Sequence, residues 1–106
     1  MINPQELFDK AMTAAEDWAD KDEAADNLDD AVDALKGLIF SELKAKGESV
    51  TLIPVLAKKD ERYVELQKDY LAAKKEAIIA KLKYDQINRF MDNVRTKEST
   101  ERALAR

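Results

Sequence analysis

The clearest pattern in the chain is a row of apolar residues in its second half, spaced alternately by three and four positions. The row runs without a slip for more than four heptads. Such a sustained 3.5-residue repeat is typical of a supercoiled helix seam. A helix from residue 60 to about 100 would be ~60 Å long at ~1.5 Å per residue, and it must bury this seam against another helix. The row comprises Tyr63, Leu66, Tyr70, Ala73, Ala77, Ala80, Tyr84, Ile87, Met91 and Val94.

The first half carries a helical pattern with marked ends. Asn3 is a good N-cap, Pro4 fits the first helical position, and Ile2 with Leu7 has the spacing of a hydrophobic staple. Gly47 is a good C-terminal stop. The stripe thins over residues 20–24, where the pattern leaves open whether the helix kinks or continues. It includes Phe8, Ala11, Ala15, Trp18 and Ala19, then Ala25, Leu28, Val32, Leu35 and Ile39.

These signals divide a single domain into three segments: an acidic helical segment at 1–47, a connector at 48–59 and a heptad-patterned helix at 60–106. The connector is expected to begin as an extended segment over residues 49–54, because Pro54 disfavours the α conformation at Ile53. Asp60 can cap the helix that follows. The fold class predicted is all-α, with the two long segments forming an antiparallel hairpin of coiled-coil character.

The side chains along the second seam suggest what it contacts. Three alanines at its centre, Ala73, Ala77 and Ala80, let a neighbouring helix come close, which favours a tight antiparallel hairpin. Leu71, Ile78 and Leu82 are expected to widen the apolar stripe on one side. The bulky end of the seam is expected to extend past a shorter first helix, which predicts a homodimer or higher homo-oligomer. The residues predicted for self-association are Tyr84, Ile87, Met91 and Val94.

The composition excludes several kinds of chemistry. The chain has no cysteine and no histidine, so disulfides, thiolate metal sites and the commonest general base are absent. We find no catalytic constellation, phosphate-binding loop or metal motif, and we predict no catalytic, metal-binding or cofactor-binding residue and no cofactor. No apolar stretch is long enough to cross a bilayer, and the N-terminus does not resemble a signal peptide. A cytoplasmic protein without membrane contact is expected.

Charge is divided unevenly between the two halves. Residues 1–56 carry 13 acidic and 5 basic side chains, whereas residues 57–106 carry 9 acidic and 13 basic ones. This asymmetry is typical of an acidic helix paired with a basic one. It is also compatible with weak binding of the second helix to nucleic acid through its lysines and arginines, although acidic residues dilute that charge and the chain is −4 overall.

The acidic residues of the first helix form its densest polar cluster, and three interpretations remain open. They are a solvated face that favours solubility, a surface complementary to a basic partner such as a mimic of nucleic-acid phosphate, or a carboxylate site for Mg²⁺. The metal site is the weakest of these, because the apolar stripe and not the acidic residues takes the inward face. The candidate partner-binding residues are Asp22, Asp26, Asp29, Asp30 and Asp33.

The second half also resembles a group of small helical proteins of bacteriophages and prophages. The similarity spans residues 60–103, and its most specific part is the closing segment 95–103. It implies a genetic neighbourhood of replication and recombination functions, with no functional residue to transfer. The matching segments are Asp60-Glu61-Arg62-Tyr63, Leu71-Ala72-Ala73-Lys74 through Lys83-Tyr84, and Arg95-Thr96-Lys97-Glu98-Ser99-Thr100-Glu101-Arg102-Ala103.

Together these observations predict a non-enzymatic phage accessory or adaptor protein that binds a host or phage protein through its helical hairpin. One variant is an acidic inhibitor or modulator of a nucleic-acid-processing protein. The alternative is an accessory factor of phage recombination or replication that binds nucleic acid directly. If it is encoded by a phage, the protein would work in the host bacterial cytoplasm.

Overall fold

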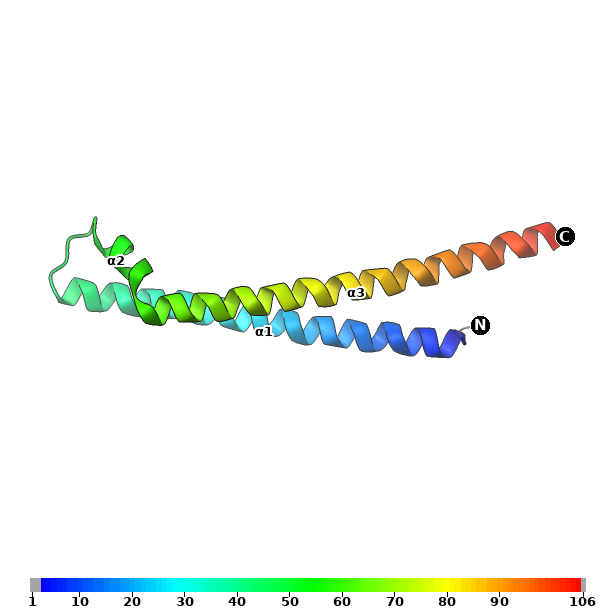
Figure 1. The fold of residues 1–106 in the computed structure, drawn as a ribbon, viewed down its shortest axis with the longest axis horizontal. Coiled ribbons are helices and arrows are strands. Elements are labelled where there is room, and N and C mark those ends of the chain that lie inside the picture. The colour runs from blue at the N-terminus through cyan, green and yellow to red at the C-terminus, as the bar shows by residue number, and fades with distance from the viewer. Residues whose placement is uncertain (1–2, 106) are drawn as a thin grey trace.

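The computed structural model describes residues 3–105 and shows an antiparallel hairpin of two long helices. Helix α1 spans Pro4–Ala45, the short helix α2 spans Ile53–Lys59, and helix α3 spans Glu61–Ala105. The molecule measures 81 × 22 × 14 Å, and both termini lie at one end of it, which we call the free end (Figure 1). The predicted all-α hairpin is therefore confirmed.

The ends of the long helices follow the sequence signals closely. The Asn3 Oδ1 atom accepts a hydrogen bond of 2.9 Å from the Gln5 amide, and the Asp60 Oδ1 atom accepts one of 2.9 Å from the Arg62 amide. Gly47 has a φ of 83°, and the amides of Gly47 and Glu48 bond back to the last turn of α1. This is a Schellman termination, which needs the left-handed conformation that glycine adopts without strain. The proposed staple involves Ile2, which lies outside the described residues.

The seam predicted for α3 is the face that packs on α1. Each of its ten positions is buried or half-buried, and the two deepest are Ala77 and Ala80, which are 5% and 4% exposed. Leu71, Ile78 and Leu82 do not widen this contact, because they are 54%, 52% and 56% exposed. Leu71 and Ile78 each follow a seam residue by one position, and Leu82 follows one by two positions, which turns them away from the line of contact.

Helix α1 continues without a break through residues 20–24. Its buried and half-buried positions keep the alternation of three and four through Trp18, Lys21 and Ala25, so Lys21 occupies a seam position. Of the stripe predicted at the start of α1, Ala11 is buried and Ala15 and Trp18 are half-buried, but two members lie off the seam. Leu7 lies on the seam, whereas Phe8 is 52% exposed and Ala19 is also exposed. The alternation that runs through Trp18, Lys21 and Ala25 reaches residue 7 and not residue 8.

The connector differs from the extended segment that was predicted. Leu52 is in the right-handed helical region, and Ile53 already begins α2. The Ser49 carbonyl accepts hydrogen bonds from the amides of Leu52 and Ile53 at 3.0 and 3.1 Å, which stabilises the turn. Pro54 is tolerated because a first-turn residue needs no amide donor. Ile53 and Ala57 are 7% and 1% exposed, so α2 closes the loop end of the hairpin.

Candidate interaction surfaces

A three-residue ion-pair cluster ties the two long helices together near the loop. The Arg62 guanidinium donates to both carboxylate oxygens of Glu42, at 3.2 and 2.7 Å, and to both of Asp60, at 3.1 and 3.0 Å. Its hydrogen bonds to Glu42 and then to Asp60 raise the pKa of Arg62. The same hydrogen bonds are the main cause that lowers the pKa of Glu42 and that of Asp60 below their usual 4.5 and 3.8.

This cluster predicts a pH-dependent stability. The two carboxyl pKa values are lower in the folded chain than in the unfolded chain. The cluster therefore stabilises the fold fully above pH 4.5, and this stabilisation is lost as the pH falls through the folded-state pKa values. Arg62→Met should lower the free energy of unfolding at about pH 7, and its difference from wild type should shrink at about pH 3. Urea unfolding at both pH values measures this. Arg89→Met on the same helix is the control, and a difference for Arg62→Met that does not change with pH would contradict the assignment.

A second polar contact lies in the middle of the seam. The Lys21 Nζ atom is 3.6 Å from the Glu76 Oε2 atom, with 42% and 63% of the two side chains exposed. The aliphatic part of Lys21 fills a seam position while its ammonium group reaches the edge. At this exposure the pair contributes little stability, and a polar residue at a seam position serves mainly to fix register. The spacing of Lys21 from Trp18 and Ala25 would have revealed this position in the sequence.

An aromatic layer next to Lys21, on the side toward the free end, helps to fix the register of α1 against α3. The ring centroids of Trp18 and Tyr84 lie 5.5 Å apart, and the Lys81 Nζ atom lies 5.8 Å from the Trp18 ring centroid. Stepping one heptad toward the loop from this layer brings Ala25 opposite Ala77. The hairpin thus places a bulky aromatic layer one heptad away from a layer of two alanines.

The residues predicted for self-association lie in this intramolecular contact. Tyr84 stacks on Trp18 of the same chain, and Tyr84, Ile87, Met91 and Val94 are all half-buried. These residues do not extend past α1, because Pro4 and Leu7 of α1 line one groove together with Met91 and Val94. Tyr84→Asp would therefore disturb the hairpin itself. Self-association, and the role of these four residues in it, stays a prediction.

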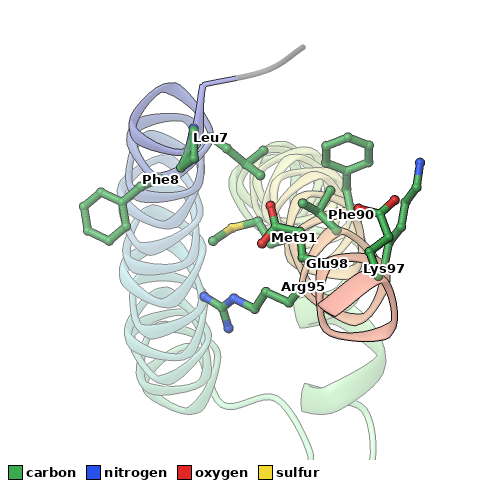
Figure 2. A pocket seen from close by; sticks show the side chains of 10 residues that line it. Leu7, Phe8, Phe90, Met91, Arg95, Lys97 and Glu98 are labelled. Carbon is green, nitrogen blue, oxygen red and sulfur yellow. The ribbon is translucent and has the colours of Figure 1, made fainter. Parts of the chain in front are cut away.

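The two helices separate toward the free end (Figure 1) and leave a groove of about 620 Å³ between them. Figure 2 shows Leu7 and Met91 reaching into the space between the helices, while the rings of Phe8 and Phe90 stand on their outer sides. These rings are 52% and 45% exposed. We call this region the free-end groove. Its lining residues are Pro4, Leu7, Phe8, Phe90, Met91, Val94, Arg95, Lys97, Glu98 and Glu101.

A smaller groove of about 150 Å³ runs along one side of the hairpin near its middle. Asp22 and Asp26 of α1 and Lys74 and Lys81 of α3 line it together. Acidic and basic side chains therefore meet across this groove, as the charge asymmetry of the two halves suggested. Lys74 also lies over the Tyr70 ring, with its Nζ atom 5.9 Å from the ring centroid.

The five aspartates predicted to bind a partner, Asp22, Asp26, Asp29, Asp30 and Asp33, are all exposed in the structure. Asp22 and Asp26 line the side groove together with lysines of α3. Over residues 3–105, no three acidic side chains come close enough together to hold a metal ion. Whether the acidic face binds another molecule stays a prediction.

Two further findings bound what these surfaces can do. Within the described residues, no helix is long and apolar enough to cross a membrane. No protein-family model, curated protein or solved structure matches this chain, so its function has to be inferred from its own residues.

Proposed function

We propose that this protein is a non-enzymatic accessory or adaptor protein that binds another protein at the free end of its hairpin. The free-end groove carries the proposal, because large apolar side chains gather there where the two helices separate. Phe8 and Phe90 are half-exposed aromatic residues on either side of it. Half-exposed aromatic side chains beside a groove are the usual anchors of protein interfaces.

Direct binding to nucleic acid is less well supported than binding to protein. Lys74 and Lys81, two central basic residues of α3, lie over the rings of Tyr70 and Trp18 and share a groove with aspartates. Aspartates beside these lysines weaken their attraction for a phosphate backbone. We place the partner among phage or host proteins on the resemblance of residues 60–103 alone, and the cytoplasmic location likewise stays a prediction.

Site-specific photocrosslinking in cells that make the protein tests the proposal. A benzophenone amino acid replaces Phe90 in one variant and Lys83 in the control, which lies one heptad earlier on the same helix and outside the groove. We expect discrete cross-linked proteins from position 90 that are missing from position 83. Adding Phe8→Asp and Leu7→Ser should reduce them, because the polar groups oppose docking of an apolar partner. The same cross-links from both positions, or none from position 90, would refute the assignment.

A further inference from the structure

The free-end groove continues the seam that holds α1 and α3 together. Leu7 of α1 and Met91 and Val94 of α3 occupy seam positions and line the groove. Along the rest of the hairpin such positions pack on the opposite helix, whereas here the helices separate and leave about 620 Å³ between them (Figures 1 and 2). The three side chains are half-buried, so part of their apolar surface stays in water.

The sequence of α3 gives a physical reason for this separation. The alternation of three and four that passes through Met91 and Val94 next reaches Glu98 and then Glu101. Burying a carboxylate against α1 without a partner for its charge is costly. Among the described residues, Glu98 forms one ion pair, with Arg102 of the same helix at 3.9 Å. The apolar part of the seam therefore ends at Val94, and the groove beside it stays open.

We propose that the free-end groove takes up an amphipathic helix of another protein, with apolar residues spaced alternately by three and four. The lining residues of α3 run from 90 to 101, and the stretch from Met91 to Glu101 is about 15 Å long at ~1.5 Å per residue, close to three helical turns. The inserted helix would pack its apolar residues on Leu7, Met91 and Val94 and complete the seam. This inference rests on the proposed function and names the kind of partner that the groove binds.

The seam positions in the walls of the groove are the reason to expect a helix. Side chains spaced by three and four leave holes between them that fit the side chains of another helix with the same spacing. An extended peptide would bring unpaired amide and carbonyl groups into an apolar groove, whereas a helix bonds its own. At its outer mouth the groove carries charges of both signs, so the helix should be polar there and apolar deeper inside. These charges belong to Arg95, Lys97, Glu98 and Glu101.

A second copy of this chain offers no free helix of this kind. Its two long helices already pack their apolar rows on each other. Within residues 3–105, the exposed large apolar side chains form no row of more than two members at spacings of three or four. Phe8 with Met12 and Ile78 with Leu82 are such pairs. The helix that fills the groove is therefore expected to come from a different protein.

Two synthetic helical peptides of identical composition test the inference. The first has leucines spaced alternately by three and four over three heptads, and the second has the same residues rearranged so that the leucines lie all around the helix. Fluorescence anisotropy with the full chain, below the concentration at which the peptides self-associate, measures the affinity. We expect the first peptide to bind at least about tenfold more tightly, because only it presents one apolar face to the groove.

Substitutions in the groove locate the binding. Leu7→Ser with Val94→Ser should weaken binding of the first peptide about tenfold or more. Val94→Phe keeps the wall apolar but fills part of the groove, so it should also weaken binding, whereas a peptide docked outside the groove would bind as before. Leu71→Ser is the control, because Leu71 is 54% exposed on α3 and lies outside the groove, and this variant should bind as wild type does. Circular dichroism should show that each variant keeps its helices.

Several results would overturn the inference. They are equal affinity for both peptides, no measurable binding of either, or binding that the Leu7→Ser and Val94→Ser changes and the Val94→Phe change leave intact. Sedimentation showing a wild-type dimer that the two serine changes dissociate would assign the groove to a second copy. If cross-links from position 90 persist although neither peptide binds, the helical partner is wrong and the proposed function stands. If the first peptide binds in the groove but position 90 gives no cross-links in cells, the proposed function fails and the preference of the groove for a helix stands.

Discussion

Replacing Ile39 with alanine is expected to lower the free energy of unfolding by about 2–5 kcal/mol, the range found for large apolar residues removed from a core. Ile39 is only 2% exposed and is the most completely buried large side chain among the described residues. Its loss removes apolar burial and leaves a cavity that two long, stiff helices fill poorly. In a hairpin with one line of contact, no other layer compensates for the deleted atoms.

The neighbouring residue supplies the control for this change. Leu38 is 53% exposed, so Leu38→Ala removes the same number of carbon atoms from a surface position and should change the free energy by less than about 0.5 kcal/mol. Urea unfolding followed by circular dichroism measures both variants. Equal losses at positions 38 and 39 would mean that the outer side of α1 is covered in solution.

Replacing Ala77 with leucine is expected to destabilise the hairpin by about 1–3 kcal/mol, because the seam has no room for a larger side chain there. Ala77 is 5% exposed, and the register set by Trp18 and Tyr84 places it opposite Ala25, which is also 5% exposed. Two alanines in one layer let the helices come close, so a leucine must push them apart and loosen the layers on either side.

Ala72→Leu tests whether bulk alone causes the effect. Ala72 is exposed on α3, and leucine is nearly as good a helix former as alanine, so this variant should keep the stability of the wild type. Thermal unfolding of the two leucine variants gives the comparison. An Ala77→Leu chain as stable as wild type would show that the central layer is not closely packed. A new oligomer formed by that variant would show that the seam had opened to take up a second chain.

Local signals in the sequence were sufficient to predict the ends of the long helices, where a single residue determines the backbone conformation. Asn3 and Asp60 accept amide hydrogen bonds as N-caps, and Gly47 ends α1 in the left-handed conformation. The α3 seam was also predictable, because apolar residues in a strict heptad row lie on one face of a helix, and that face packs against the neighbouring helix. The connector was mispredicted because two amides bonded to the Ser49 carbonyl outweigh the preference that Pro54 imposes on Ile53.

The position of α1 against α3 could not be derived from either helix alone. The spacing of Lys21 from Trp18 and Ala25 indicates a seam position, but only the structure shows that its partner on α3 is Glu76. Arg62, Glu42 and Asp60 likewise become one cluster only when the chain folds back on itself.

The sequence by itself determined that this protein is two long helices with a seam between them, because helical periodicity and caps act over a few residues. Only the tertiary structure decided which apolar side chains lie outside the seam and remain exposed. Leu71, Ile78 and Leu82 looked like part of the contact, and Phe8 looked like part of its start, yet all four are exposed. A single line of packing between two helices can bury only one narrow stripe of each. The register that determines which stripe is buried therefore also determines which apolar side chains remain exposed.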